Sequence, residues 1–592
     1  MDYIKLTEYY QKLESTSKRL EKTYIIYQLL REIKKEQDVS PIISLLTGKV
    51  FPAWDERKIG FSDKLVIKAL AVSTGNSAEK IVKLFSKTGD LGLVAEELTK
   101  DKKQTTLTTR KLTVDLVYNK IRELAELEGE GTVNKKVGFI SELLTSASPI
   151  ESKFIVRTIL EQLRVGVAEG TIRDAIMWCF FSDKIKLKYD QETNELEIPK
   201  EHQAEYNNIS EIIQHGYDLT NDFSEVFKII KEEGIKSLEK IKLKAGKPLN
   251  VMLFQKAKDI QEAFEIVGKP CVFEFKFDGF RLQCHCNNGK ITLYTRRLEN
   301  VTKQFPDVVE ILRKNVKAEN YILDAEAIGI DPKTKKWLPF QAVSQRIKRK
   351  YDIEDLAKKI PVMLHVFDIV SYNNESLLEA PFNRRRHVIE KIIKEVPEKI
   401  APAKQIVTDK LEEAEKFYKE SLELGNEGVM VKNLSSPYKP GSRVGYGVKI
   451  KPILETLDLV IVKAEHGEGK RAGWFTSYTV ACYDEKKENL LEIGKVSTGV
   501  KEKEQEEEIT YDGITKLLKP SITETNGKEV SVNPKIIIEV AYEEIQKSTG
   551  YSSGYGLRFP RIIRVRFDKK LNDINTIKEI NNIYENQRGR IH

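Results

Sequence analysis

The chain has 592 residues, of which 40% are hydrophobic and 32% are charged. That length is too great for one ordinary core and predicts three or four globular domains. The 98 basic and 90 acidic residues leave a net charge of +8, so a nucleic-acid surface would need locally clustered lysines and arginines. No run approaches the roughly 18 apolar residues of a membrane span, and no signal peptide is evident, so we expect an intracellular protein without a membrane partner.

Residues 1–240 have the sequence pattern of helices. Apolar residues recur at three- and four-residue spacing in segments such as KLVIKALAV and FIVRTILEQLRVGV. A glycine and a proline in residues 244–250 (KAGKPLN) then mark a break. We therefore predict an all-α domain over residues 1–240 and a new domain from residue 241.

Residues 241–451 alternate between two patterns. Short β-rich runs, including CVFEFKFD, NYILDAEAIG and VMLHVFDIV, are separated by helical pieces such as RRRHVIEKIIKEV, which predicts an α/β (α+β) domain. Residues 452–592 contain the strand-like runs SYTVACYD, NLLEIGKV and IIRVRF, joined by polar or glycine-containing turns. This pattern of short strands and turns predicts a small β-barrel, followed by a short C-terminal helix.

The five cysteines form no recognisable framework. An odd number scattered among apolar neighbours predicts reduced, buried thiols. Cys284, His285 and Cys286 could suggest metal ligands, but in a strand His285 points away from both cysteines. No second cysteine or histidine cluster completes a site, so we do not expect structural zinc.

The segment EFKFDGFR, residues 274–281, is the first that predicts chemistry. Side chains alternate along a strand, so Glu274, Lys276 and Asp278 would share one face and three phenylalanines the other. A lysine flanked by two carboxylates, with Gly279 next to relax the backbone, is typical of a nucleophile. An amphipathic strand with solvated charges is the alternative.

Three further segments carry charged residues on predicted strand faces. A single such residue usually lies on a solvated face, but several in one domain predict a shared cleft for phosphates and metal. The pairs are Asp324 with Glu326, Glu427 with Lys432, and Lys449 with Lys451.

In chain order these segments resemble the motifs of the covalent nucleotidyltransferases. The matching runs are KFDGFR (276–281), YTRRLENVT (294–302), LDAEAIG (323–329), VFDIV (366–370), EGVMVK (427–432), KIK (449–451) and LRFPRIIRVRFDK (557–569). Within that superfamily, residues 157–176 are similar to the DNA-binding domain of ATP-dependent DNA ligases of the archaeal and eukaryotic replicative kind. The resemblance implies a helical DNA-binding domain over 1–240, a nucleotidyltransferase domain over 241–451 and an OB-fold with a C-terminal helix over 452–592.

The resemblance also implies a role for each matching residue. Lys276 is expected to attack the α-phosphate of ATP, Glu274 to read the adenine amino group and Phe367 to stack on the adenine. Glu427 is expected to hold magnesium, or manganese in its place. Further contacts are expected from Arg281 and Glu326 on the ribose side, from Arg296, Arg443, Lys449 and Lys451 at the phosphates, and from Arg558 at the leaving pyrophosphate. One position departs from the pattern, because many ligases carry tryptophan where this chain has Gly447.

Elementary chemistry supports a cationic setting for Lys276. A free lysine has a pKa of about 10.4, so near neutral pH its deprotonation costs roughly 4 kcal/mol. Lys449, Lys451 and a magnesium ion would all disfavour an ammonium beside them. They would also stabilise the phosphate oxygens during phosphoryl transfer.

The function implied is an ATP-dependent DNA ligase that seals nicks in duplex DNA during replication, recombination and repair, acting as a monomer through lysyl-AMP and then DNA-adenylate. An RNA ligase or capping guanylyltransferase would lack the helical 240 residues, and an NAD-dependent ligase would carry a cysteine zinc site. A catalytically inactive DNA-binding scaffold would not be labelled by ATP. Residues Gln104 to Leu107 lie where related ligases bind a sliding clamp, but the expected aromatics are missing, so a polar loop is equally compatible.

Overall fold

The computed structural model of the chain describes residues 1–592 except 53, 56, 58, 101–110, 128–130, 339, 348–351, 442, 453–455, 468–470, 472, 502–508 and 587–592; at 340, 341, 443 and 444 it describes the backbone only. The candidate clamp-binding element, Gln104 to Leu107, lies outside the described residues. Two compact units are formed, one by residues 1–76 and 95–451 and the other by residues 77–94 and 452–592. Among the described helices, none has the length and apolar character needed to cross a membrane.

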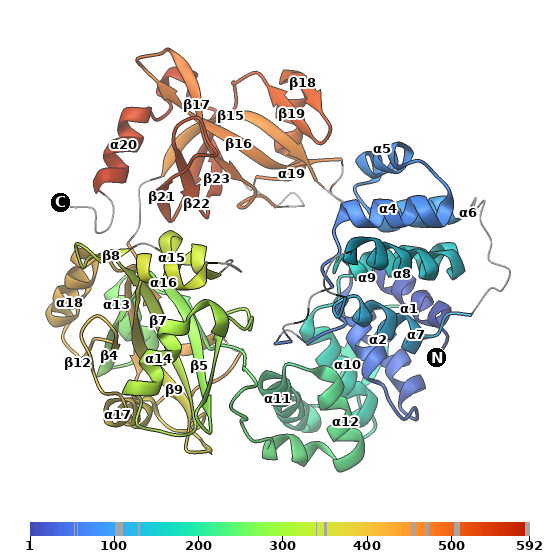
Figure 1. Cartoon of the computed structure of the whole chain (residues 1–592), viewed down its shortest axis with the longest axis horizontal. Helices are drawn as coiled ribbons and strands as arrows, with labels where there is room; N and C mark the ends of the chain where they lie inside the picture. The colour runs from blue at the N-terminus through green and yellow to red at the C-terminus, as the bar shows by residue number, and fades with distance from the viewer. Residues whose placement is uncertain are drawn as a thin grey trace. The chain divides into compact units, whose positions relative to one another are not determined.

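The N-terminal part of the first unit is helical, as predicted (Figure 1). The first helix, for example, buries one face, with Tyr3, Leu6, Tyr10 and Leu13 at helical spacing. The helices are α1 (Tyr3–Ser15), α2 (Arg19–Ile33), α3 (Ser40–Leu46), α4 (Asp63–Thr74), α6 (Leu91–Lys100), α7 (Val114–Glu123), α8 (Thr132–Ser146), α9 (Pro149–Ile159), α10 (Glu169–Phe181), α11 (Gln203–Thr220) and α12 (Phe223–Glu233).

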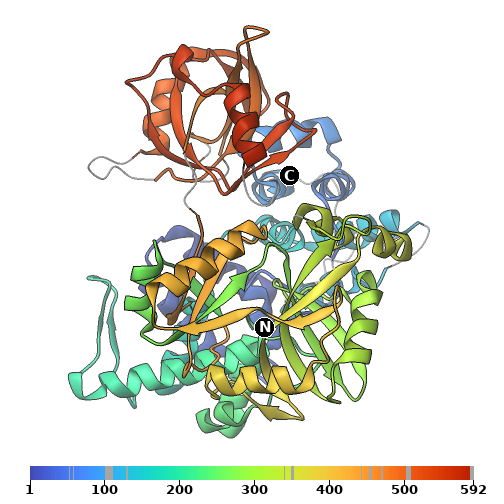
Figure 2. The ribbon, with the colours of Figure 1, turned by 90° about the vertical axis from the view of Figure 1, so that its left-hand side faces the viewer.

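One hairpin interrupts the helices and was not predicted. Strands β1 (Lys188–Asp190) and β2 (Glu195–Glu197) pair antiparallel and extend away from the neighbouring helices (Figure 2). The ring of Tyr189 lies 5.7 Å from that of Trp178 and 5.1 Å from that of Tyr24, while the flanking charged residues are exposed. The hairpin is therefore anchored to the helices through one aromatic cluster.

Residues 251–451 contain two β-sheets. The five-stranded sheet has the order β12 (Gln405–Thr408), β4 (Cys271–Lys276), β13 (Gly428–Asn433), β14 (Arg443–Ile450), β3 (Leu253–Lys256). The seven-stranded sheet has the order β10 (Glu375–Ser376), β9 (Val362–Tyr372), β7 (Tyr321–Ile330), β5 (Phe280–Asn287), β6 (Lys290–Thr295), with β11 (Ile400–Pro402) on β9 and β8 (Trp337–Leu338) on β7. All neighbours run antiparallel except β11 with β9 and β14 with β3.

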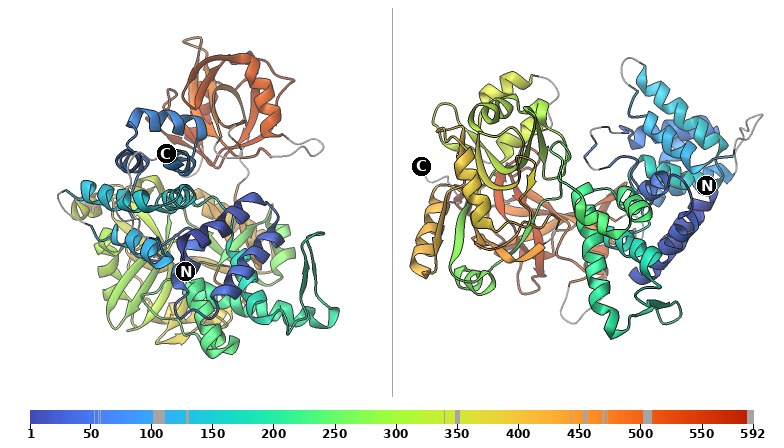
Figure 3. Two further views of the ribbon diagram at one scale, coloured as in Figure 1. Left: turned by 90° about the vertical axis from the view of Figure 1, so that its right-hand side faces the viewer. Right: turned by 90° about the horizontal axis from the view of Figure 1, so that it is seen from below.

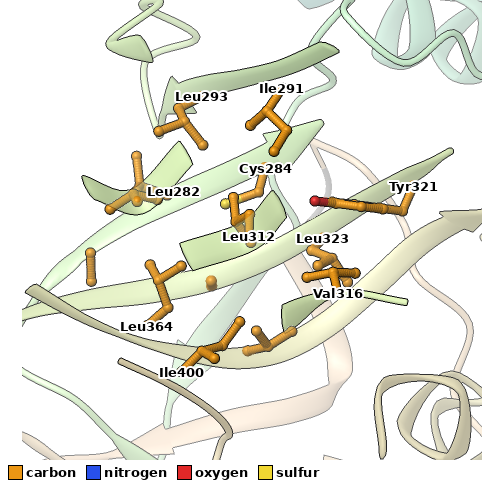
Figure 4. Close-up of a cluster of buried hydrophobic side chains, with 14 of the residues drawn as sticks. Leu282, Cys284, Ile291, Leu293, Leu312, Val316, Tyr321, Leu323, Leu364 and Ile400 are labelled. Atoms are coloured by element: carbon orange, nitrogen blue, oxygen red, sulfur yellow. The ribbon is translucent and has the colours of Figure 1, made fainter. Parts of the chain in front are cut away.

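Each sheet packs one face against its own helices. Phe273 and Phe275 of β4 are buried with residues of α13 (Ile260–Val267) and α18 (Leu411–Glu423). Alternate residues of β5, β7 and β9 form a second core with α14 (Pro306–Asn315) and α17 (Phe382–Ile392). Figure 4 shows part of this core, including Leu282, Leu323, Leu364 and Leu312 of α14. The opposite faces of the two sheets are therefore available for polar groups, as the alternating pattern predicted. Two short helices, α15 (Phe340–Ile347) and α16 (Ile353–Lys359), complete this region.

The predicted break at residues 244–250 is an irregular segment fixed to the seven-stranded sheet. The backbone N–H of Gly246 donates to Nδ1 of His285 (3.0 Å), and that of Leu249 donates to the side chain of Gln283 (3.0 Å). Burial lowers the pKa of His285 to about 3, so its imidazole is neutral and can accept this bond. His285 thus holds the connecting segment, and its neighbours Cys284 and Cys286 face the core on the other side of the strand.

The second unit is rich in strands, as predicted. Its main sheet consists of β17 (Asn489–Val496), β16 (Phe475–Asp484), β15 (Leu457–His466), β19 (Glu529–Val532) and β18 (Ile522–Asn526), with β20 (Ile537–Ala541) on β15 and β23 (Arg561–Val565) on β20. These strands curve round a shared core (Figure 3). The unit also contains the hairpin β21 (Glu544–Lys547) and β22 (Tyr555–Arg558), and the helices α5 (Ala78–Thr88), α19 (Tyr511–Leu518) and α20 (Ile577–Asn586).

Candidate active site between the two sheets

Strand β4 supplies the central pair of charged residues. Because Phe273 and Phe275 face the core, Glu274 and Lys276 project from the other face, as predicted. The strand ends at Lys276, however, so Asp278 lies in the turn to β5 and not on the strand. The expectation that all three charges share one strand face was therefore wrong for Asp278.

Gly279, in the same turn, is needed for a reason other than the one predicted. Its φ is not in the left-handed region, but a Cβ there would lie 2.4 Å from the carbonyl oxygen of Ala327. A glycine lets the turn approach the backbone of β7 closely. That approach brings the end of β4 beside Glu326, the preceding residue of β7.

Lys276 is ion-paired to Glu427. Its Nζ lies 2.7 Å from Oε2 of Glu427, and Nζ of Lys451 lies 2.8 Å from the same oxygen. Burial alone would raise the pKa of Glu427, but the two lysines outweigh it and hold that pKa well below its usual range. One carboxylate thus gathers two lysines that are widely separated in the sequence.

The backbone fixes Glu427 in this position. Its N–H donates to the carbonyl of Lys276 (2.8 Å), which joins the start of β13 to the end of β4. The next residue, Gly428, has a φ of +136°, and a Cβ there would lie 2.1 Å from the carbonyl oxygen of Ile450. Only glycine allows β13 to begin so close to β14.

Glu326 faces the same group from the seven-stranded sheet. Burial raises its pKa to about 8, Lys276 opposes that rise, and the negative charges of Glu427 and Asp278 add to it. Two carboxylates with opposite shifts in pKa therefore lie beside one lysine. Paired shifts of this kind are typical of active sites.

Glu274 lies deeper and has a different lysine. Nζ of Lys432 lies 3.0 Å and 2.5 Å from its two carboxylate oxygens and 3.3 Å from the carbonyl oxygen of Phe367. Both side chains are almost fully buried, with 2% of Glu274 and 5% of Lys432 exposed. The half-buried ring of Phe367, on β9, lies beside this pair, 5.3 Å from the lysine nitrogen.

Arg281 is held by two neighbouring side chains. Its Nη2 donates to Oδ2 of Asp324 (2.6 Å) and to the hydroxyl of Tyr438 (3.1 Å), and that hydroxyl donates to Asp324 (2.7 Å). The guanidinium carbon lies 5.1 Å from the ring centroid of Phe367. Burial would lower the pKa of Arg281, but the charge of Asp324 outweighs it and raises that pKa. The arginine is thus fixed and charged next to the aromatic ring.

Several predicted residues lie outside these ion pairs. Arg296 is exposed in the turn after β6 and has no hydrogen bond or ion pair to any described residue. Lys449 is half-buried on β14, whereas the side chain of Arg443 lies outside the described part of that strand. Arg558 belongs to the second unit, where Nη1 lies 3.2 Å from Oε2 of Glu544. At Gly447, a Cβ would lie 2.6 Å from the ring of Phe254, so that ring already occupies the adjacent space.

The sequence interpretation missed the residues that hold the others in place. Tyr438 lies in a loop, and no periodic pattern singles it out. The buried pair Arg385 and Asp368 (2.7 Å) lies on α17 and β9, and only the unusual aspartate within the apolar run VFDIV hinted at it. These groups are recognisable only when elements distant in the sequence come together.

The arrangement fits attack by an amine on a phosphate. Lys276 is a partly exposed amine, 23% accessible, at the edge of a cationic group. Oxygen donors for a hard divalent cation are present at Glu427 and Glu326, although the described residues contain no preformed cluster of three or more metal-ligating side chains. Phe367 offers a flat apolar surface, and Glu274 a buried hydrogen-bond acceptor beside it.

Comparisons with known proteins agree across the chain. Three family models match: the DNA ligase N terminus over residues 2–177, the ATP dependent DNA ligase domain over 251–451 and the ATP dependent DNA ligase C terminal region over 471–569. The DNA ligase of Nanoarchaeum equitans is 48% identical over 100% of both chains, and that of Thermococcus onnurineus is 40% identical over 99% of this chain and 98% of its own. A solved structure entitled Pmar-Lig_PreS3 shares the fold over 95% of this chain and 99% of its own, with a TM-score of 0.54 at 15% identity.

Proposed function

The chain belongs to the ATP-dependent DNA ligases, and from that premise we propose which residues carry each step. The family and the nick-sealing activity predicted from the sequence are confirmed. The observation that carries the assignment of residues is the pairing of Lys276 with Glu427, between sheets that also present Phe367 and Glu274. Lys276 is the nucleophile, Phe367 stacks on the adenine and Glu274 accepts from its amino group.

Three steps follow from these roles. The Lys276 amine attacks the α-phosphorus of ATP, the bond to the β-phosphate breaks and pyrophosphate leaves. An oxygen of the 5′-phosphate at the nick then attacks the AMP phosphorus, and the bond to Lys276 breaks. Finally the 3′-hydroxyl attacks the 5′-phosphorus, and AMP leaves. Positioning and positive charge are the main requirements of each transfer.

The charged residues around Lys276 bind the other parts of the nucleotide. Arg281 and Glu326 bind the ribose side, while Arg296, Arg443, Lys449 and Lys451 bind phosphate oxygens. Arg558, on the second unit, orients the pyrophosphate during the first step. Because Lys451 and Lys276 share Glu427, a phosphate entering between them would replace the carboxylate as the partner of both lysines.

A magnesium ion fits the carboxylate of Glu427, which is held ionised beside the place proposed for the phosphates. Magnesium favours one or two carboxylates with substrate phosphates and water over an all-protein cage, and manganese has similar preferences. When bound, it would neutralise charge that develops on the phosphate oxygens. Glu427 would hold the ion and, in doing so, release Lys276 from its ion pair.

We also propose the wider organisation of the enzyme. The domains are a helical DNA-binding domain over residues 1–240, a nucleotidyltransferase domain over 241–451 and an OB-fold domain over 452–592. A monomer binds nicked duplex DNA through phosphates without reading sequence, inside the cell with the chromosome. A sliding clamp would bind at Gln104 to Leu107.

Incubation with ATP labelled on the α-phosphate tests the function directly. We expect a covalent adduct that survives denaturation and is lost in Lys276→Ala. A nicked duplex should then be sealed with release of AMP, and parallel assays with ADP, GTP and NAD define the cofactor. A protein that binds DNA but acquires no label would instead be the inactive scaffold.

A further inference from the structure

The pair formed by Glu274 and Lys432 is buried more deeply than any role in phosphate transfer requires. Lys432 lies on β13, two residues beyond Met430, the residue that faces Glu274 across the two strands. All three N–H groups of its ammonium have acceptors, namely the two oxygens of Glu274 and the carbonyl of Phe367. Its nitrogen also lies 4.6 Å from the ring centroid of Phe382. The lysine has no donor left for a phosphate.

These contacts suit an ammonium paired with a carboxylate. An ammonium surrounded by two aromatic rings and a neutral carboxyl would be an unpaired buried charge, which is strongly unfavourable. A carboxylate without the ammonium would be equally isolated. Glu274 therefore depends on Lys432 for its ionised form.

The charge state of Glu274 determines which purine it can bind. A carboxylate can only accept hydrogen bonds, whereas a protonated carboxyl can also donate one. The 6-amino group of adenine donates, so it pairs with the carboxylate. The 6-oxo group of guanine or hypoxanthine accepts, so it would be repelled by the carboxylate but could bind a protonated carboxyl.

We propose that Lys432 is a positioning residue for base selection: its ammonium keeps Glu274 an acceptor-only carboxylate and so makes the site select a 6-amino purine over a 6-oxo purine. The proposal rests on the proposed role of Glu274 at the base. It adds a residue that does not touch the nucleotide but determines what the contacting residue can recognise.

Other groups near Glu274 do not replace Lys432. Burial is the largest influence on Glu274 and leaves its pKa above the usual value; Lys432 is the strongest influence that lowers this pKa, and Arg386 on α17 lowers it less. Asp368 on β9 acts in the opposite direction, although it is itself paired with Arg385. Opposite Glu274, the neighbouring strands β12 and β13 present Gln405 and Met430, which carry no charge.

The test compares ATP with inosine triphosphate, which replaces the 6-amino group by a 6-oxo group. Rates of adduct formation with each nucleotide, labelled on the α-phosphate, would be measured from pH 6 to 9 in the full-length enzyme. The wild-type preference for ATP should be constant over this range. In Lys432→Met, the preference for ATP over inosine triphosphate should fall by about 10- to 100-fold at pH 6, which is the contribution of one hydrogen bond to a charged group. The preference should recover as the pH rises and Glu274 ionises.

Two controls separate base selection from folding. Lys153 is another buried lysine, ion-paired with Glu14 (2.8 Å) and 5.2 Å from a phenylalanine ring centroid. Lys153→Met should therefore leave the ratio of the rates with ATP and inosine triphosphate unchanged. Lys432→Arg keeps the charge and should retain more of the preference for ATP than Lys432→Met. Equal loss of activity with both nucleotides, or an unchanged ratio at every pH, would overturn the proposal.

A third variant tests the role of the Glu274 charge in base selection if Lys432→Met does not fold. Glu274→Gln presents both a donor and an acceptor, so its preference for ATP should be reduced and independent of pH. A wild-type ratio in that variant would also overturn the proposal. Failure of the wild-type enzyme to acquire any label from ATP would instead reject the proposed function.

Discussion

The two lysine–glutamate pairs of the active site use the same chemistry for opposite purposes. At the end of β4, Lys276 shares Glu427 with Lys451, and about a quarter of its side chain is exposed. Glu274, two residues earlier on the same face of β4, pairs with Lys432 of β13. Both side chains are almost completely shielded from solvent, and Lys432 also donates to the backbone carbonyl of Phe367. The first pair can be taken apart by a phosphate or a cation, whereas the second cannot.

This difference shows that burial and the number of partners decide what an ion pair does. An accessible pair in which one carboxylate serves two lysines is poised to exchange partners. A buried pair in which every donor is used fixes a charge state and a geometry. We therefore expect substitutions at the first pair to affect the rate of chemistry, and those at the second to affect recognition and stability.

The largest effect is expected for Lys276→Ala. Adduct formation with ATP should fall below detection, because no other amine on that strand face can replace Lys276. A nick that already carries AMP on its 5′-phosphate should still be sealed, since this step needs only the metal, the surrounding cationic residues and an aligned 3′-hydroxyl. Lys410→Ala, which removes an exposed lysine paired with Glu413, is the matched control. Equal loss on both substrates would point to a folding defect.

Glu427→Gln should be the next most harmful change. It removes the charge that gathers Lys276 and Lys451 and would hold a divalent cation, so adduct formation should fall by about 10²- to 10³-fold. In contrast to Lys276→Ala, it should also slow sealing of the pre-adenylated nick. Glu413→Gln, at an exposed glutamate, provides the control. Normal sealing of that substrate would remove Glu427 from the later steps.

Tyr438→Phe should have a smaller effect that concerns binding. The variant keeps the ring but removes the hydroxyl that joins Arg281 to Asp324, while the direct contact between those two residues remains. We expect the KM for ATP to rise several-fold, and the free energy of unfolding to fall by about 1 kcal/mol, with little change in kcat. Denaturant titration and initial rates measure both quantities. A fall in kcat with unchanged KM would place Tyr438 in the chemistry.

The last effect appears only when pH is varied, and it concerns the stability contributed by Glu326. Its pKa is raised to about 8 in the folded protein, mainly by burial, so the protonated form favours folding. That contribution is complete below the unfolded pKa of about 4.3 and is lost as pH rises through 8. Glu326→Gln should therefore melt close to the wild type at pH 4, and at a higher temperature at pH 9, where a rise of more than three pKa units corresponds to a few kcal/mol. An identical difference at both pH values would contradict the shifted pKa.

The sequence by itself determined the kind of enzyme and most of its elements. Alternation along β4 separated the core phenylalanines from Glu274 and Lys276, because strand side chains point to opposite faces whatever the tertiary context. Helical periodicity identified the N-terminal helices, and the ordered motifs identified the family. The hairpin β1–β2 was missed because its two strands are short and are stabilised by Trp178 and Tyr24, far away in the sequence.

Only the tertiary structure decided which charges pair. Glu274 precedes Lys276 by two residues, yet it pairs with Lys432 because β13 lies beside β4 in antiparallel register. Asp278 left the strand face because the chain must turn against β7, which also explains Gly279. The pKa values of Glu326 and Glu427 shift in opposite directions because burial outweighs attraction at one and two lysines outweigh burial at the other. Ionisation depends on burial and on neighbouring charges in three dimensions, which a linear motif does not specify.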